Sequence, residues 1–463
     1  MNVSRRTALG LAVTGIGLAA CEKSSDNTPS SSTVASDEAR DIAKAAYVFG
    51  YPLVLMDLTR AAAEAVTPVN TFQHAGALPT PERRDVVRLN LDTLYSAAWL
   101  DVSAEPVVLR VPSMDPGRFW LMQLLDAWTN TVHNPSSIRP QVNSGGPPYT
   151  YLVTGPKWSG TVPDDMTQLS VPTPTVWLLG RIQVDGPDDI PVVTALQEQL
   201  KLAPFSAWAE GRPPPPAPTP TGTTAVPPPK QVLEMDAATF FKRMCAVLAV
   251  NPPRPEDEPA MKRFATIGIR PGGSVQGISN DDLTVAADDA KKEIPAYEAP
   301  NMVNENGWRF NPKVGTYGTD YPLRANTAWV GLGANLAEDA IYPTMFSNAD
   351  LSGASAKFRL YFPPGRLPPV DAFWSLTAYD ADSYLVPNTA NIYAIGHQVP
   401  VVPNSDGSVE LAVQHEDPGP SVPAGNWLPI PASGQFSLTM RLYAPKDIAI
   451  DGLWQPPVLT VVR

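Results

Sequence analysis

Cysteine is nearly absent from this chain, which has two among 463 residues. Cys21 ends an apolar N-terminal stretch, and Cys245 lies inside the apolar run 240–250. A chain of this length can bury cores large enough to do without disulfides. If Cys21 carries a lipid, Cys245 has no partner, so we expect it to be a buried structural thiol and not a nucleophile.

Histidine and familiar catalytic motifs are also scarce. The histidines are scattered without ligand-like spacing, which excludes a histidine-rich metal site; they are His74, His133, His397 and His415. The chain has no Gly-x-Ser-x-Gly elbow, no phosphate-cradling Gly-Lys-Ser/Thr loop and no dinucleotide fingerprint after a strand. We therefore expect no metal and no cofactor, which leaves carboxylates and tyrosines as acids and bases.

Charge is low, at 17% of residues, and the net charge is -12. Without a cluster of Lys and Arg to neutralise phosphates, the sequence excludes a nucleic-acid partner. Proline is abundant, with 53 residues, which is about twice ordinary usage. This composition favours strands and long ordered loops over surface helices.

The N-terminus resembles an export signal. Arg5-Arg6 precedes an apolar run at 8–20, which is short for a membrane span and ends in Leu18-Ala-Ala-Cys21. Small residues before a cysteine are typical of a bacterial lipobox, so we expect residues 1–21 to be a lipoprotein signal peptide, with lipid on Cys21 and the mature protein on the periplasmic face of the envelope. The alternative is an ordinary signal peptide. The paired arginines are compatible with twin-arginine export.

The remaining sequence divides by pattern. Residues 22–36 are rich in Ser, Thr and Asp and predict a flexible tether. Residues 37–211 predict an N-terminal domain: a helix at 37–49, interrupted by Gly50-Tyr51-Pro52, and then short strands. Residues 212–230 form a Pro-rich linker or loop. Residues 231–345 predict a helical connector, and residues 346–463 a C-terminal β-sandwich domain.

The first strand-rich region is echoed in the second. Phe-Trp occurs at 119–120 and 373–374, each Trp is followed six residues later by Asp, and each Asp eight residues later by Asn. The aspartates are Asp126 and Asp380, and the asparagines are Asn134 and Asn388. The fold class predicted from this echo is α+β, with two β-sandwich (jelly-roll-like) domains related by internal duplication and a helical insert between them.

One candidate site lies on the stretch 324–342, which we predict to be a single helix. Arg324, Asn335 and Tyr342 fall on one stripe of that helix, with Asp339 beside it. Gly331 on the same stripe would let another group approach the backbone. The stripe is either a close-packed face with a solvated polar edge or the wall of a cleft that binds a ligand.

Other candidates lie on the strands. Asn90 and Asp92 point to one face of a predicted strand, and Tyr95 could donate its phenol to a substrate; Asp92 could equally be a turn or cap residue. The strand 372–380 adds Trp374, Tyr379 and Asp380, and the Asp either bonds a turn or faces a cleft.

These motifs resemble a bacterial family with two paired domains of unknown function, numbered 1254 and 1214. The first domain matches through Gly50-Tyr51-Pro52, Asn90-x-Asp92-Thr-x-Tyr95 and the segment 118–126. The second matches through 331–335, 339–343, 373–380, 426–429 and 452–457. The resemblance implies β-sandwich or jelly-roll-like domains with helical additions, and it implies no agreed activity and no known catalytic residues.

Two functions fit the sequence. The first is a membrane-tethered enzyme that acts on a small molecule without a metal, with its site between the two sandwiches. The second is a non-catalytic envelope protein that binds a ligand or glycan through an aromatic cleft. Whether the chain is an enzyme, and its oligomeric state, stay open at this stage.

Overall fold

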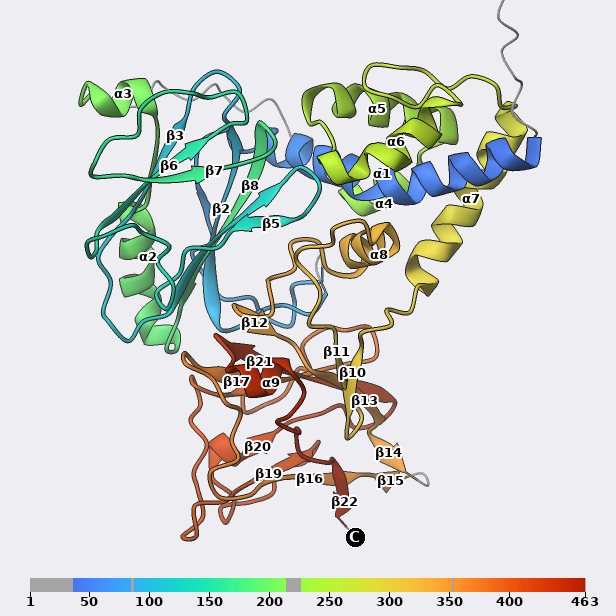
Figure 1. Ribbon diagram of the computed structural model, residues 1–463. Coiled ribbons are helices and arrows are strands. Elements are labelled where there is room, and N and C mark those ends of the chain that lie inside the picture. Colours follow the sequence, from blue (N-terminus) through green and yellow to red (C-terminus); the bar gives the residue numbers. More distant parts are fainter. Residues whose placement is uncertain (1–35, 85–86, 214–225, 352–353, 463) are drawn as a thin grey trace, which may run out of the picture.

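The computed structural model describes residues 36–84, 87–213, 226–351 and 354–462. Figure 1 shows two β-sandwiches and a helical unit that meet near the middle of the molecule. The first sandwich lies at upper left, the helical unit at upper right and the second sandwich below both. The predicted signal peptide, Cys21 and most of the predicted tether lie outside the described residues.

The first sandwich packs a five-stranded sheet, in the order β1-β2-β8-β4-β5, on a four-stranded sheet, β7-β6-β3-β9. Apolar residues that alternate along these strands form the core between the sheets. The strands are β1 (Gln73–His74), β2 (Thr93–Asp101), β3 (Val107–Val111), β4 (Trp120–Asp126), β5 (Thr131–His133), β6 (Tyr149–Thr154), β7 (Thr167–Ser170), β8 (Thr175–Gln183) and β9 (Lys201–Pro204). Helices α2 (Ile190–Gln199) and α3 (Phe205–Ala209) accompany them.

The second sandwich has the same plan. Its larger sheet runs β10-β11-β13-β21-β17-β18, with β12 also on β21, and its second sheet runs β20-β19-β16-β22. These strands are β10 (Val303–Glu305), β11 (Trp308–Phe310), β12 (Ala340–Ile341), β13 (Thr344–Asn348), β16 (Lys357–Phe362), β17 (Trp374–Tyr379), β18 (Ala394–Gly396), β19 (Val409–Gln414), β20 (Trp427–Leu428), β21 (Gln435–Tyr443) and β22 (Thr460–Val462). A small hairpin, β14 (Asp350–Leu351) with β15 (Ala354–Ser355), and helix α9 (Asp447–Ile450) complete it.

The predicted duplication is confirmed strand by strand. The order β2-β8-β4-β5 corresponds to β13-β21-β17-β18, and β7-β6-β3-β9 corresponds to β20-β19-β16-β22. Even the parallel pair recurs, because β6 with β7 and β19 with β20 are both parallel. Trp120 and Trp374 take equivalent positions, since each begins a strand paired antiparallel with the corresponding neighbour, β8 or β21.

The two aspartates also correspond, but the asparagines do not. Asp126 accepts from the backbone N–H groups two and four residues later, at Trp128 and Asn130, and Asp380 does the same at Asp382 and Tyr384. Asn134 bonds acidic side chains of the other half of the chain. Asn388 bonds backbone carbonyls within its own loop. The shared spacing to these asparagines is therefore a coincidence.

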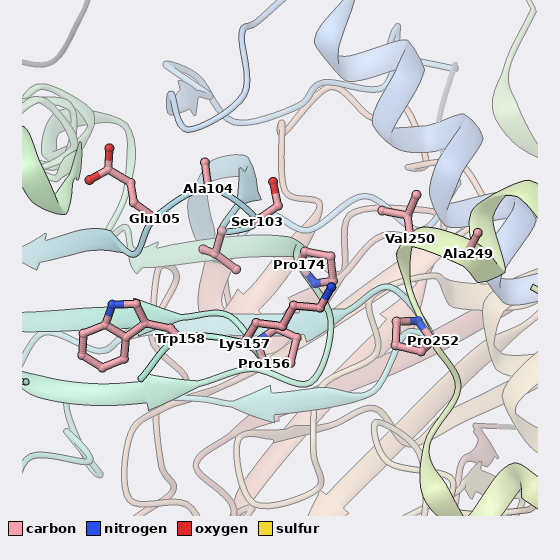
Figure 2. Close-up of a pocket in the computed structure, with 11 residues that line it drawn as sticks. Ser103, Ala104, Glu105, Pro156, Lys157, Trp158, Pro174, Ala249, Val250 and Pro252 are labelled. Atoms are coloured by element: carbon pink, nitrogen blue, oxygen red, sulfur yellow. The ribbon is translucent and has the colours of Figure 1, made fainter. Parts of the chain in front are cut away.

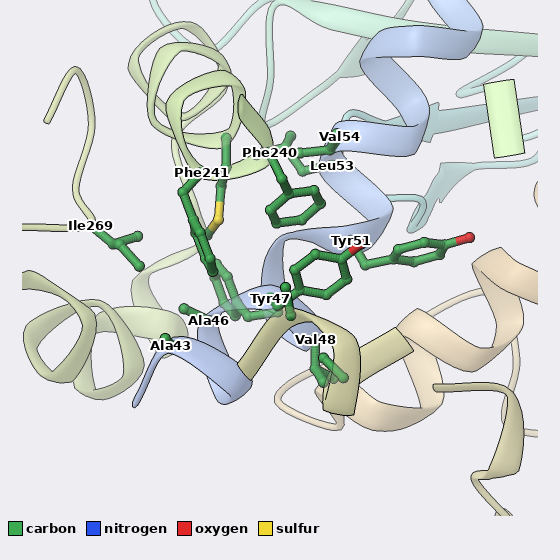
Figure 3. Close-up of a cluster of buried hydrophobic side chains, with 14 of the residues drawn as sticks. Ala43, Ala46, Tyr47, Val48, Tyr51, Leu53, Val54, Phe240, Phe241 and Ile269 are labelled. Atoms are coloured by element: carbon green, nitrogen blue, oxygen red, sulfur yellow. The ribbon is translucent and has the colours of Figure 1, made fainter. Parts of the chain in front are cut away.

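The helical unit is built around α1 (Ser36–Glu64), which runs unbroken through Gly50-Tyr51-Pro52, so the predicted interruption there is wrong. Helix α5 packs against α1 so closely that a Cβ on Gly50 would lie 2.4 Å from Sδ of Met244. Figure 3 shows this core, where Tyr47 stacks on Phe240 with ring centroids 3.9 Å apart. The other helices are α4 (Pro228–Glu234), α5 (Ala237–Val250), α6 (Glu258–Ala265), α7 (Asn280–Ala296) and α8 (Tyr321–Gly331).

Two predicted boundaries differ from the structure. Helix α1 packs in one hydrophobic cluster with the helical connector, so it belongs to that unit and not to the first sandwich. The connector itself contains β10 to β13, which complete the large sheet of the second sandwich. The Pro-rich stretch 212–230 is not extended throughout, since α4 begins at Pro228, where a proline in the first turn needs no N–H donor.

The predicted helix 324–342 is also wrong. Helix α8 ends at Gly331, and Gly333 has a left-handed backbone with φ of 84°. A Cβ on Gly333 would lie 2.8 Å from Cδ1 of Leu179, so the chain beyond the helix lies directly against β8. The stretch then turns and becomes β12, which places Asn335, Asp339 and Tyr342 beside a sheet and not along a helix.

Helix α1 is long and apolar enough to span a membrane, and among the described residues it alone meets that test. However, 78% of its most apolar window is buried inside the protein. We therefore interpret it as a core helix. Cys245 lies in the same core with 1% of its surface exposed, which confirms its prediction as a buried thiol.

Candidate active site between the two sandwiches

The larger sheet of each sandwich is buried on both faces. One face carries the alternating apolar residues of the sandwich core, and the other carries polar side chains that are nevertheless buried. The polar faces are turned toward each other, because Ser375 on β17 bonds Asp92 before β2, and Phe119 packs edge to face on Phe373 at 6.0 Å. Phe119 and Phe373 are equivalent residues of the two copies, so the interface has an approximate two-fold relation.

Arg181 and Tyr95 form the centre of this interface. They face each other across β2 and β8, and the Arg181 guanidinium lies 5.0 Å from the Tyr95 ring centroid. Burial acts to raise the pKa of Tyr95, but the charge of Arg181 and hydrogen bonds from Arg181 and Asn90 lower it below its ordinary value. The direction of the shift in the pKa of Tyr95 is therefore set by its polar neighbours, because burial alone would raise it.

A chain of polar contacts leads from Tyr95 into the second sandwich. Nδ2 of Asn90 donates to the hydroxyls of Tyr95 at 3.3 Å and Tyr443 at 2.9 Å. Tyr443 in turn donates to Oδ2 of Asp92 at 3.4 Å, and the same oxygen accepts from Ser375 at 2.7 Å. These contacts tie residues of both copies into one network.

His397 ends this network. Its Nε2 donates to the backbone oxygen of Val184 at 2.9 Å, and its Nδ1 lies 3.6 Å from Oδ1 of Asp92 without a hydrogen-bond partner in the described part of the chain. A carboxylate beside an imidazole can fix the orientation of the ring.

The second copy supplies a matching set. Arg441 lies opposite Ser375 on β17, as Arg181 lies opposite Leu121 on β4. The register of β12 and β13 on β21 puts Tyr342 opposite Arg441, as Tyr95 is opposite Arg181. Asn335 donates to the Tyr342 hydroxyl at 2.6 Å, which repeats the Asn90–Tyr95 contact. Burial raises the pKa of Tyr342 to about 12.

The two arginines differ in how completely they are bonded. Arg441 donates to Thr377, to the Tyr379 hydroxyl and to the backbone oxygens of Arg88 and Leu89. Arg181 donates to Gln123 at 2.9 Å and contacts Tyr95, and its buried Nε has no hydrogen-bond partner among the residues described. Hydrogen bonds within the protein thus fix Arg441, whereas Arg181 retains a free donor.

Asp339 flanks the site on a second link between the copies. It accepts from Nη2 of Arg139 at 2.7 Å and from Asn134 at 2.8 Å, and it is 1% exposed. Burial raises its pKa to about 6. Its position three residues before Tyr342 matches that of Asp92 before Tyr95.

The structure brings together Asn90, Asp92, Tyr95, Asn335 and Tyr342 of the predicted site residues, with Asp339 at one side. Tyr379 lies at the margin, where its hydroxyl donates to the backbone oxygen of Leu89 at 2.8 Å. Two sets of residues that were predicted from different stretches of the chain therefore form one cluster.

Arg324, which was predicted to lie with them, is not part of this cluster. It is buried in the helical unit, with its guanidinium 5.0 Å from the ring of Phe49 and 4.9 Å from that of Trp128. The prediction failed because the stretch from Arg324 to Tyr342 does not continue as one helix, so the stripe that joined them does not exist.

Trp374 and Asp380 were also predicted as site residues, and both lie outside the cluster. Trp374 alternates with Ser375 on β17 and therefore points into the core of the second sandwich, where it lies 5.9 Å from Phe362. Asp380 caps its own turn and faces Arg84 at 3.9 Å on the surface. Of the two roles considered for Asp380, the turn role is the one observed.

Sequence reasoning missed the central residues: Gln123, Arg181, His397, Arg441 and Tyr443. A signal for the arginines was present. Strands β8 and β21 are each nine residues long with a single charge, an arginine at the seventh position. Aligning these two strands as duplicates would have identified a charged residue buried in each sheet.

A separate pocket of about 400 Å³ lies between the first sandwich and the helical unit. Figure 2 shows Trp158 and Glu105 at one end and the end of α5 at the other. None of the predicted site residues reaches it. It is lined by Val102, Ser103, Ala104, Glu105, Pro156, Lys157, Trp158, Pro174, Ala249, Val250 and Pro252. Within the described ranges, no group of three His, Cys, Asp or Glu residues is arranged to hold a metal ion.

Comparisons with known proteins agree with this architecture. The family model described as "Protein of unknown function (DUF1254)" matches residues 69–204. The family model described as "Protein of unknown function (DUF1214)" matches residues 339–447. A crystal structure of the VPA0106 protein from Vibrio parahaemolyticus has a TM-score of 0.68 at 23% identity, covering 92% of this chain and 100% of that one.

A second structure is more distant. An uncharacterised protein from Burkholderia cenocepacia has a TM-score of 0.44 at 13% identity, over 92% of this chain and 94% of that one. No curated protein matches the chain. The two matched regions include β1 to β9 and β12 to β21, the strands of both sandwiches that enclose the site. The chain belongs to the family that pairs an N-terminal DUF1254 domain with a C-terminal DUF1214 domain.

Proposed function

We propose that this protein is an enzyme that performs acid–base chemistry on a small molecule between the two sandwiches, without a metal. Tyr95 is the proton-exchanging group. As a phenolate it takes a proton from the substrate, and as a phenol it returns one. Arg181 stabilises negative charge on the phenolate and on the deprotonated substrate, which is the role of a fixed cation in a site of low dielectric.

The environment of the Tyr95 hydroxyl carries this proposal. A pKa that Arg181, with Asn90 and Arg441, lowers in a place where burial acts to raise it is the kind of perturbation that clusters at functional sites. Tyr95 and Tyr342 both keep part of their surface accessible, whereas Arg181 and Asn335 beside them are buried.

The proposal is tested by turnover of small molecules in cell-envelope extracts. Purified protein is incubated with the extract, and consumed species are identified by mass spectrometry. We expect at least one species that wild type consumes and Tyr95→Phe does not. Tyr361→Phe is the matched control, since Tyr361 is 40% exposed on the second sandwich. Equal consumption by wild type and Tyr95→Phe would refute the role of Tyr95.

We also propose that the protein acts at the periplasmic face of the envelope, held by a lipid on Cys21. The support is the apolar run that ends in Leu18-Ala-Ala-Cys21. Radiolabelled palmitate should enter the wild-type protein and not Cys21→Ala, and the variant should leave the membrane fraction. Membrane attachment of Cys21→Ala without label would point to a different anchor.

The alternative is a binding protein without catalysis, and the pocket in Figure 2 favours it. Gly160 lies against the Trp158 ring, where a Cβ would come within 2.6 Å of Cζ2, so the ring is held at the pocket's edge. An aromatic face of this kind suits a sugar ring. Quenching of tryptophan fluorescence by chitooligosaccharides, lost in Trp158→Ala, would support this function.

A further inference from the structure

We infer that the interface site takes a small carboxylic acid with a hydroxyl group next to its carboxylate. This inference rests on the proposed function for the location of the site and names the class of its substrate. It follows from two buried polar atoms, one donor and one acceptor, that the protein itself leaves without partners.

The donor is Nε of Arg181. The Arg181 side chain is 5% exposed, and its Nε has no acceptor among the residues described. Nη1 is already used by Gln123 at 2.9 Å, which fixes the plane of the guanidinium. A buried N–H without a partner is costly, and an arginine recognises carboxylates best through neighbouring N–H groups. A carboxylate oxygen is the acceptor that suits this atom.

The acceptor is Oδ1 of Asn335. Asn335 is 2% exposed, and its Nδ2 donates to the Tyr342 hydroxyl at 2.6 Å, so the amide orientation leaves Oδ1 to accept. Oδ1 has no donor in the described part of the chain. A carboxylate cannot donate to it, but a hydroxyl group can.

The two atoms belong to one rigid assembly. Nε2 of Gln123 donates to the backbone oxygen of Ala334 at 2.8 Å, and Gln123 also accepts from Arg181. Ala334 is bonded directly to Asn335, so one glutamine connects both orphan groups. Arg181 also acts electrostatically on Tyr342, whose hydroxyl accepts from Asn335, so the free donor and the free acceptor belong to the same part of the interface.

The charge of the interface favours an anion. Arg88, Arg181 and Arg441 contribute three guanidinium groups, and Asp92 is a carboxylate that acts on Arg441. Asp339 is occupied with Arg139. A neutral diol would leave the arginine excess uncompensated, whereas a carboxylate balances part of it.

Glycolate is the probe that tests this inference, with acetate and ethylene glycol for comparison. Acetate lacks the hydroxyl, and ethylene glycol lacks the carboxylate. By calorimetry on the full chain, we expect glycolate to bind at least about tenfold more tightly than acetate, as expected for one hydrogen bond to a buried group. Ethylene glycol should not bind detectably.

Variants assign the two contacts. Arg181→Met should weaken glycolate binding at least about tenfold, whereas Arg359→Met, at a surface pair with Glu410, should not. Asn335→Leu should reduce glycolate to the affinity of acetate. Arg181→Lys, which keeps the charge but not the fork, should also weaken binding, and thermal unfolding of each variant shows that it is folded. Equal binding of glycolate and acetate to wild type, or glycolate binding unchanged in folded Arg181→Met or Arg181→Lys, would overturn the inference.

Tyr95→Phe separates this inference from the proposed function. In the Tyr95→Phe background, Arg181→Met should still weaken glycolate binding at least about tenfold, since neither orphan atom belongs to Tyr95. If Tyr95→Phe leaves metabolite turnover unchanged while glycolate binding still depends on Arg181, the catalytic proposal fails and the ligand class stands. If turnover needs Tyr95 but glycolate binds no better than acetate, the ligand class fails and the catalytic proposal stands.

Discussion

Arg181 and Arg441 hold the same position in the two copies of the sandwich, and each donates its Nη1 at 2.9 Å to the residue two places along the neighbouring strand from its direct partner. Only Arg441 goes on to use its other nitrogen for the backbone oxygens of Arg88 and Leu89. Arg441 therefore has a structural role, whereas Arg181 keeps a buried N–H that could donate to a ligand.

This difference predicts unequal costs of substitution. Arg441→Met should reduce the free energy of unfolding by roughly 3–5 kcal/mol, because it leaves several buried acceptors without a donor. Arg181→Met should cost less, about 1–3 kcal/mol. Denaturant unfolding of both variants measures the comparison, and equal losses would show that the free Nε of Arg181 does not reflect a weaker structural role.

Tyr95 should be among the first tyrosines to ionise as pH rises. In wild type its pKa lies below the ordinary value, and Arg181→Met should raise it, since burial then acts without the opposing cation. A lowered folded-state pKa contributes stability that is fully present above about pH 10, the unfolded value, and is lost as pH falls through the folded value. Ultraviolet titration of tyrosinate checks this: the earliest transition should vanish in Tyr95→Phe and move to higher pH in Arg181→Met.

Asp339 should give stability a pH dependence of opposite sign. Burial raises its folded pKa to about 6, above the ordinary value of 3.8. The contribution is therefore complete below the unfolded value and is lost as pH rises through about 6. Relative to Asp339→Asn, wild type should lose up to about 3 kcal/mol between those limits. The free energy of unfolding is measured for both proteins at several pH values. A constant difference between them across this range would contradict the pKa shift.

The equivalent turns after β4 and β17 offer a matched pair of substitutions. Asp126 is fully buried and also bonds Arg254 at 3.0 Å, whereas the Asp380 side chain is 24% exposed. Asp126→Ala should cost roughly 3 kcal/mol, since it also leaves Arg254 without its buried partner, and Asp380→Ala should cost about 1 kcal/mol. Chemical denaturation compares the two costs directly. Equal costs would mean that the turn hydrogen bonds alone, and not the contact with Arg254, account for the loss of stability.

Glycine should be needed at position 50 because the Met244 side chain leaves no room for a Cβ, and not because of its backbone conformation. Gly50→Ala places a Cβ 2.4 Å from Sδ of Met244 and should destabilise α1 by about 1–3 kcal/mol. In a Met244→Ala background the same change should be neutral or stabilising, because alanine favours a helix over glycine by about 1 kcal/mol. A double-mutant cycle gives the coupling, and additive effects would exclude this contact as the reason for the glycine.

The sequence was sufficient for the architecture because the duplicated strands carry strong local patterns. The Phe-Trp pairs at 119–120 and 373–374 stand at the start of equivalent strands, β4 and β17. The site was harder, since the equivalent residues Tyr95 and Tyr342 are 247 positions apart and meet only through packing of whole sheets. Helical periodicity across 324–342 was misleading because Gly333 turns the chain against β8, a contact that no local pattern encodes.

The edge-to-face contact of Phe119 with Phe373 has a consequence for how such a chain arose. A residue meets its own counterpart only at the axis of a symmetric pair. The interface described here is therefore what a homodimer of single-sandwich subunits would form, now fused in one polypeptide. Fusion releases each half from having to remain identical to the other, so an ancestral arginine present twice could become an anchor in one half and a recognition group in the other.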